Sequence, residues 1–313
     1  MLRAVKETGE TAVRPVTTGM RVLLVAFTAL TVLAFVALDV LATRTADFFA
    51  WTIEPPATAA FLGSGYAAGT LLVALTLRTR AWTNARVAVL TVLVFTVLTL
   101  GATLLHLDKF HFGADGVVAW AAAWFWLAIY LVVPVALAVL VVLQRRAPGA
   151  DPPVGPPMPS WLALVLAAQG TLLIAVGVAL YVAPATAAAL WPWPLTPLTA
   201  RAVAAWLLAF GIAAALAIGE RDFGRLELPA AAYTALGTLQ LVTVVRFAGE
   251  LRWASPAAWA YVAVLVTVVA TGGYGWWAGF GHHRGRVPPI ARRAERVPPA
   301  VDDPTPELFR SAS

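Results

Sequence analysis

Residues 144–160 read QRRAPGADPPVGPPMPS, and this proline-rich stretch divides the chain into two halves of similar length. Each half holds four apolar stretches long enough to cross a bilayer, whose core needs roughly 20 helical residues. The predicted spans cover 22–43, 57–77, 86–107, 117–143, 161–182, 198–219, 228–247 and 256–279. The runs are continuously apolar, whereas membrane strands alternate apolar and polar residues. The sequence therefore predicts an all-α integral membrane protein with eight transmembrane helices.

The composition agrees with a lipid environment. Of the 313 residues, 60% are hydrophobic and 12% are charged, whereas soluble domains average about 25% charged residues. The absence of cysteine excludes disulfides and thiolate metal sites. The net charge of +6 comes from basic residues that lie mostly on one side of the predicted membrane spans, so no nucleic-acid partner is predicted.

The basic residues are distributed unevenly between the two sides of the membrane. With the N-terminus inside, 17 of the 22 lysines and arginines fall on the inner side. The other five are Arg44, Lys109, Arg201, Arg246 and Arg252. Because cytoplasmic loops carry the excess of Lys and Arg, both termini are predicted to be cytoplasmic. The preference for arginine over lysine, with abundant Ala, Val and Leu, is typical of GC-rich bacteria and favours a plasma (inner) membrane location.

The second half resembles a diverged copy of the first. Residues 51–55 read WTIEP and residues 193–197 read WPLTP, and a glycine follows each proline after fourteen residues. The offset there is 142; it is 140 between 103–106 and 243–246, and 135 between 124–126 and 259–261. An even number of spans per half makes these parallel repeats. The predicted units are an N-terminal cytoplasmic tail 1–20, four-helix repeats 21–143 and 161–280, the linker 144–160, and a basic, Pro-rich, disordered cytoplasmic tail 281–313.

Two polar stripes occupy equivalent spans of the predicted repeats. Spacings of three and four residues place each stripe on one helical face. The stripes are Thr96, Thr99, Thr103 and His106 on the third span, and Gln240, Thr243, Arg246 and Glu250 on the seventh. A charge at membrane depth is costly and is by default a functional hypothesis.

The outer ends of these spans therefore form the candidate site. In one hypothesis Arg201 and Arg246 hold an anionic group, while His106 and Glu54 move a proton. The remaining candidate ligand-binding residues are Asp39, Glu250, Gln240, Thr99 and Thr103. In the alternative, the same charges pair across the seam and lock the two halves together.

A metal site is a weaker hypothesis for the same region. His106, Asp108 and His111 supply nitrogen and oxygen ligands, but their spacing differs from the i, i+4 histidines of helical zinc motifs. No cofactor can be named from the sequence.

Two further features concern packing. Trp124, Trp126 and Trp206 lie a turn or more below the outer surface, where they either wall a pocket for a flat or apolar ligand or face lipid. In the inner loop 219–227, Glu220 and Asp222 are expected to pair with the arginines of the loop around Arg78, Arg80 and Arg86.

Three functional hypotheses follow. The leading one is a permease or ligand-binding protein for a small anionic or amphipathic molecule, with an outward-facing polar site at the seam of the repeats. The second is a structural or accessory subunit that docks a membrane protein partner. The third is an outer-leaflet enzyme with His106 as the base and Asp108 orienting it. The chain lacks a metalloprotease, Walker or dinucleotide motif, so enzymatic activity is the less favoured expectation.

Overall fold

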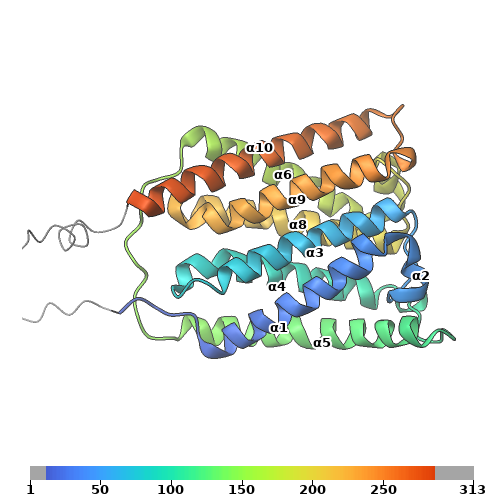
Figure 1. Ribbon diagram of the computed structural model, residues 1–313, viewed down its shortest axis with the longest axis horizontal. Helices are drawn as coiled ribbons and strands as arrows, with labels where there is room; N and C mark the ends of the chain where they lie inside the picture. The colour runs from blue at the N-terminus through green and yellow to red at the C-terminus, as the bar shows by residue number, and fades with distance from the viewer. Residues whose placement is uncertain (1–11, 286–313) are drawn as a thin grey trace, which may run out of the picture.

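The computed structural model describes residues 12–285, which form a bundle of eight long helices (Figure 1). The first half contains α1 Thr18–Phe35, α3 Pro56–Thr76, α4 Trp82–Leu104 and α5 Val117–Arg145. The second half contains α6 Ser160–Val182, α8 Pro197–Gly219, α9 Glu227–Arg246 and α10 Pro256–Gly285. Two short helices, α2 Thr45–Phe48 and α7 Pro184–Ala187, follow the first long helix of each half.

The predicted eight-span, all-α membrane fold is confirmed by the length and composition of these helices. Each of the eight is apolar and long enough to cross a bilayer, so the chain is a multi-pass membrane protein. The first candidate span, Thr18–Val40, includes a π-helical turn, Val36–Val40, that continues α1. The seventh, Phe223–Arg246, begins with a 3₁₀ turn that continues into α9.

The helices lie side by side, and α1 begins at the same end of the bundle at which α10 ends (Figure 1). We call this end, which also carries residues 146–159, the linker end, and the opposite end, which carries Trp51 and Trp193, the tryptophan end. Helix α10 continues to Gly285, past the predicted boundary at 280. Residues 1–11 and 286–313, which make up most of the two predicted tails, lie outside the described residues.

Local sequence explains where the central helices begin. Proline occupies the first turn of both α3 and α8, where its missing N–H has no intrahelical partner to lose. At α8, Thr196 and Thr199 form a capping box, in which each side chain binds the other residue's backbone N–H. The W-x-x-x-P sequences thus mark the start of a helix in each half.

Four helices form the seam between the halves. Within each half the first long helix packs on the second, α1 on α3 and α6 on α8. Across the seam α3 packs on α9, and α4 packs on α8. The second helix of each half therefore contacts the third helix of the other half.

The same contacts occur at the tryptophan end of both halves. Each half places three aromatic rings together, namely Phe49, Trp51 and Trp126 in the first half and Trp191, Trp193 and Tyr261 in the second. The ring centroids of Trp51 and Trp126 are 4.9 Å apart, and those of Trp193 and Tyr261 are 5.4 Å apart. The backbone N–H of His111 donates to Ala50 at 2.9 Å, and that of Arg252 donates to Pro192 at 2.9 Å.

The hydrogen bonds change one detail of the sequence alignment. In the sequence alignment of residues 103–106 with 243–246, at an offset of 140, His106 corresponds to Arg246. The backbone N–H of Lys109 donates to the His106 carbonyl at 3.0 Å, and that of Glu250 donates to the Phe247 carbonyl at 3.0 Å. The two turns are related by an offset of 141 residues, and at this offset His106 corresponds to Phe247. Neighbouring positions of an apolar helix carry similar side chains, so the sequence alone can misalign the two halves by one residue. We therefore use the backbone hydrogen bonds of the turns to align them.

Candidate functional site

Two arginines of the second half, at the tryptophan end, pair with residues of the first half. Nη1 of Arg201 lies 2.8 Å from Nε2 of His106 and donates to it. Nη1 of Arg246 donates to the backbone oxygen of Asp39 at 2.8 Å and forms an ion pair with its carboxylate at 3.2 Å. These contacts hold together the two halves, as the clasp hypothesis predicts.

Glu250 makes a third contact between the halves. Its Oε2 accepts a hydrogen bond of 2.8 Å from the backbone N–H of Ala57, in the first turn of α3. The first N–H groups of a helix have no intrahelical acceptor, and the helix dipole favours a negative charge there. The Glu250 carboxylate therefore caps α3.

His106 should make the stability of the protein depend on pH. Burial, together with the neighbouring Arg201 guanidinium, lowers the pKa of His106 below its usual value of 6.5. The unfolded chain then takes up a proton at a higher pH than the folded chain, so stability falls as the pH drops below about 6.5. Thermal unfolding between pH 7.5 and pH 5 should show this loss in the wild type and a smaller loss in His106→Gln. Equal losses in the two proteins would contradict the assignment.

Glu54 lies apart from the His106 pair. It is exposed and lines a cavity of about 570 Å³ at the tryptophan end, with Pro194 and Thr196 from the second half. The structure thus gives Glu54 and His106 different surroundings, although the proton hypothesis joined them.

The three residues of the metal hypothesis have separate partners. Both ring nitrogens of His111 are within hydrogen-bond distance of oxygens, 2.9 Å from the Phe49 carbonyl and 3.0 Å from the Thr52 hydroxyl. Asp108 forms an ion pair with Lys109 at 2.8 Å. Within residues 12–279 no group of three His, Asp or Glu side chains is arranged to hold a metal ion.

The threonine and glutamine residues of the two polar stripes face the interior of the bundle. Thr99, Thr103 and Gln240 are all buried. Thr103 accepts a hydrogen bond of 3.0 Å from the Trp126 indole. The Gln240 amide donates to the Phe61 carbonyl at 3.0 Å and accepts from the Tyr261 hydroxyl at 2.8 Å. These groups fasten neighbouring helices together.

Aromatic side chains fill the seam at the level of Trp206. The Trp206 ring stacks on Phe95 with centroids 3.8 Å apart and meets the edge of Tyr66 at 5.2 Å. Both Trp206 and Trp126 are buried, whereas Trp124 is 49% exposed. Trp206 and Trp126 therefore lie inside the bundle and do not face lipid. A close-packed aromatic seam does not favour a central polar path.

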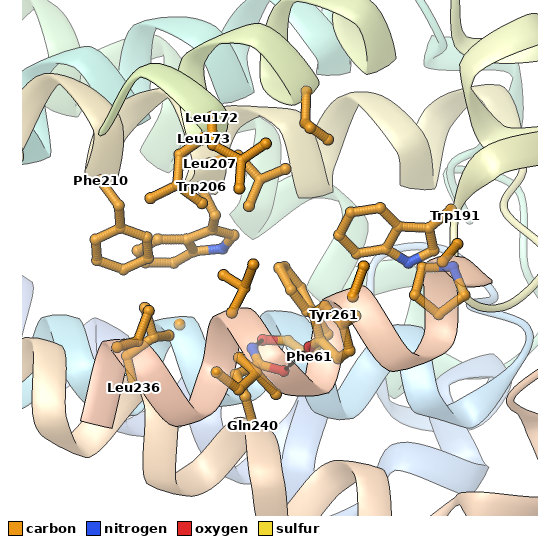
Figure 2. A pocket seen from close by; sticks show the side chains of 18 of the residues that line it. Phe61, Leu172, Leu173, Trp191, Trp206, Leu207, Phe210, Leu236, Gln240 and Tyr261 are labelled. Atoms are coloured by element: carbon orange, nitrogen blue, oxygen red, sulfur yellow. Dashed lines mark hydrogen bonds between the residues drawn. The ribbon is translucent and has the colours of Figure 1, made fainter. Parts of the chain in front are cut away.

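A separate cavity lies beside the seam in the second half. This cavity, the aromatic pocket, has a volume of about 220 Å³ and is lined by α6, α8, α9, α10, one turn of α3 and residues 190–192 (Figure 2). Trp191 and Tyr261 lie at one end and Trp206 and Phe210 at the other, with Gln240 beside Phe61 on the wall (Figure 2). The sequence pointed to Gln240 and Trp206, but it does not show that residues from five helices line one pocket.

The aromatic pocket contains few polar groups. Its polar side chains, Gln240, Tyr233 and Tyr261, stand among aliphatic and aromatic neighbours. No Asp, Glu, Lys, Arg or His of the described chain lines it. Small-molecule sites are mostly apolar with a few placed polar groups, which is the composition of this pocket.

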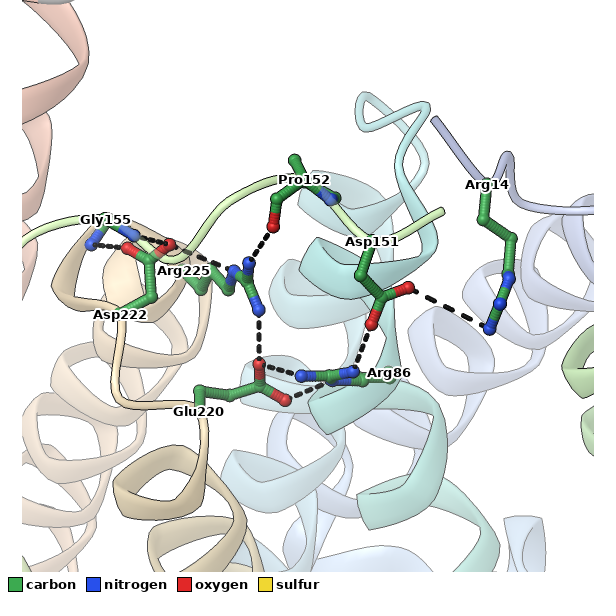
Figure 3. Close-up of polar contacts among 9 residues, drawn as sticks. Arg14, Arg86, Asp151, Pro152, Gly155, Glu220, Asp222 and Arg225 are labelled. Carbon is green, nitrogen blue, oxygen red and sulfur yellow. Dashed lines mark hydrogen bonds and ion pairs between the residues drawn. The ribbon is translucent and has the colours of Figure 1, made fainter. Parts of the chain in front are cut away.

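A network of ion pairs closes the linker end (Figure 3). Glu220 binds the guanidinium of Arg86, as expected, and also that of Arg225 at 3.1 Å. Asp222 pairs with Arg225 at 3.1 Å, whereas the sequence-based expectation was an arginine of the 78–86 loop. Asp151 of the linker adds an ion pair of 2.9 Å with Arg86.

The linker is therefore part of the folded bundle. The Gln144 side chain is fully buried, accepts from the Thr17 backbone N–H at 2.8 Å and donates to the Pro15 carbonyl at 2.8 Å. Asp222 accepts from the Gly155 N–H at 2.9 Å. These contacts tie the linker to both halves, so the network has a structural role.

Comparisons of this chain with protein families, with curated proteins and with solved structures find no match.

Proposed function

We propose that this chain is a membrane-embedded binding protein for a small amphipathic molecule, which enters the aromatic pocket from the bilayer. The observation that supports this most is the pocket itself. It combines a wall of aromatic and aliphatic side chains with the hydrogen-bonded pair of Gln240 and Tyr261. Its rim includes exposed Leu172 and Leu190, which are positioned to meet lipid.

The charges at the tryptophan end favour an uncharged ligand over an anionic one. Arg201 and Arg246 already bind His106 and Asp39, so an anion would have to displace these partners. A neutral amphipathic molecule in the aromatic pocket displaces neither. An outer-leaflet enzyme would use His106 as a base, but its Nε2 accepts from the Arg201 guanidinium.

We also infer that the fold consists of two parallel four-helix repeats in a bacterial plasma membrane, with both termini cytoplasmic. The recurring aromatic trios and the paired backbone hydrogen bonds at offsets 141 and 142 support the repeat. The seam supports it too, because α3 on α9 and α4 on α8 are equivalent contacts under an exchange of the halves. The excess of arginine at the linker end supports a cytoplasmic orientation for that end.

The pocket can be tested by filling it. Ala260 lines the pocket from α10, so Ala260→Trp should occupy it, whereas Ala263→Trp adds the same bulk at an exposed position outside the lining. A fatty alcohol with a photoactivatable group in its chain is crosslinked to the protein in nanodiscs, and the adducts are mapped by mass spectrometry. Adducts around Leu172, Leu173 and Tyr261 should fall several-fold in Ala260→Trp and persist in Ala263→Trp.

A different adduct pattern would contradict the proposal. Adducts spread evenly over the lipid-facing helices, with equal yields in the two variants, would show that the probe only surrounds the protein. In that case the accessory-subunit hypothesis becomes the better account.

A further inference from the structure

The first half contains a counterpart of the aromatic pocket. This second cavity, the α1–α5 pocket, has a volume of about 620 Å³, within the roughly 300–1,000 Å³ range of ligand pockets. Its wall residues Phe49 and Ala34 correspond, at offset 142, to Trp191 and Val176 of the aromatic pocket. On the last helix of each half, Trp126 corresponds to Tyr261 at offset 135.

The α1–α5 pocket opens toward lipid and is rich in aromatic rings. Nine of its lining residues are aromatic. Trp120, Trp124 and Phe125 are between 46% and 49% exposed, so they form the mouth. Deeper in the bundle, the buried Trp126 and Tyr130 rings lie 4.4 Å apart between centroids. Aromatic walls of this kind present faces and edges on which a flat ring can stack.

Two buried hydroxyls supply polar groups to this pocket. The hydroxyl oxygens of Tyr66 and Tyr130, both lining residues, are 2.6 Å apart. One hydroxyl donates to the other, so the pair keeps one further proton and further lone pairs. The Thr99 side chain also interacts with the Tyr130 hydroxyl, so a ligand oxygen would share this group with Thr99. The other polar lining residues, Thr31 and Thr96, donate to backbone carbonyls of their own helices.

Charge excludes several classes of occupant. No Asp, Glu, Lys, Arg or His of the described chain lines the α1–α5 pocket. A phosphate or carboxylate head group would therefore lie without a counter-ion among apolar side chains, which is costly. A neutral ring with an oxygen substituent has no such cost, and its hydrocarbon tail can leave through the mouth into the bilayer.

We propose that the α1–α5 pocket is a second binding site, which takes a neutral lipid with a flat, oxygen-bearing ring of the quinone or phenol class. The ring stacks among the aromatic walls and its oxygen hydrogen-bonds to the Tyr66–Tyr130 pair. This site is separate from the aromatic pocket of the second half, so each pocket can be tested without the other.

The probe is decylubiquinone, titrated calorimetrically into the full chain in nanodiscs, with empty nanodiscs subtracted. The double variant Tyr66→Phe/Tyr130→Phe removes both hydroxyls and leaves the rings, so neither tyrosine hydroxyl is left without the other. Its affinity for the probe should fall about tenfold, the equivalent of one lost hydrogen bond. Tyr233→Phe, the matched change in the aromatic pocket, should leave this affinity unchanged.

A second pair of variants covers the case in which the double variant fails to fold. Ala121→Trp places an indole on an exposed lining position, and Ala128→Trp places one at an exposed position of the same helix outside the lining. Only the former should abolish binding. Decane, which has no ring oxygen, should bind the wild type and the double variant equally.

Two results would overturn the proposal. One is equal affinity of the probe for the wild type and for both Tyr66→Phe/Tyr130→Phe and Ala121→Trp. The other is a wild type that gives no more heat than empty nanodiscs. Ala260→Trp should not change decylubiquinone binding, and a loss there would assign the ring to the aromatic pocket instead.

Discussion

Replacing Arg225 with methionine is expected to lower the free energy of unfolding by about 3–5 kcal/mol, the range for breaking a buried ion pair on one side. The Arg225 side chain is only 6% exposed and sits between the carboxylates of Glu220 and Asp222, which are 6% and 3% exposed. It also donates to the Pro152 carbonyl at 3.0 Å. Methionine fills a similar volume but removes the positive charge that pairs with the two carboxylates.

The control for this prediction is an exposed arginine at the same end of the bundle. Arg80→Met removes a charge from a surface position and should change stability by no more than about 0.5 kcal/mol. Chemical unfolding in mild detergent, followed by tryptophan fluorescence, measures both variants. Equal stability of Arg225→Met and Arg80→Met would contradict the structural role given to the network at the linker end.

Gly65→Ala is expected to destabilise the protein by about 1–3 kcal/mol, the typical effect of overpacking a core. A Cβ atom at Gly65 would lie 2.7 Å from the Trp206 ring. That ring stacks on Phe95 and also on Phe210, whose ring centroid lies 5.4 Å away. Moving the ring away from Gly65 would therefore disrupt these aromatic contacts.

Gly69→Ala is the matched control, one turn further along α3. A Cβ atom there would lie 3.6 Å from Trp206, which is ordinary van der Waals contact. Since alanine is favoured over glycine within a helix by up to about 1 kcal/mol, this variant should be as stable as the wild type or more stable. If both alanine variants unfold at the same denaturant concentration, the close contact between α3 and Trp206 is absent.

A closed seam changes the functional expectation. A transporter of repeated halves commonly places its site where the repeats meet, on helices broken at the midplane. Here α3 and α8 run unbroken, and Trp206 of α8 packs against Phe95 of α4. The cavities lie beside the seam, at the side of each half, which is why we propose binding from the bilayer.

The spans and the pairing of charges could be predicted from the sequence, for physical reasons. A continuous apolar run forms a helix in lipid, because its backbone N–H and C=O groups must hydrogen-bond to one another where no water is present. Charges such as Asp39 and Arg246 at membrane depth need partners, so opposite charges in the two halves indicated a clasp. The expectation that Glu220 binds Arg86 was likewise met.

The pockets and the linker contacts could not be predicted in this way. The aromatic pocket depends on how five helices pack, and the sequence shows only that Trp191, Trp206 and Tyr261 exist. The burial of Gln144 depends on hydrogen bonds to the distant residues Pro15 and Thr17. From composition alone the proline-rich stretch was interpreted as a connecting segment. In the structure its polar side chains bind the first half, and its backbone groups bind Asp222 and Arg225 of the second half.

Native mass spectrometry of the wild-type chain, extracted gently from its own membrane, tests the central claim that the lateral pockets bind a neutral lipid-like molecule. We expect a retained neutral mass that persists after loosely held lipids are removed and decreases in Ala260→Trp or in Tyr66→Phe/Tyr130→Phe. A bare chain would show that the pockets do not retain such a molecule. A retained anion whose binding is lost in Arg201→Gln would also contradict the claim, because it would move the site to the charged pairs at the tryptophan end.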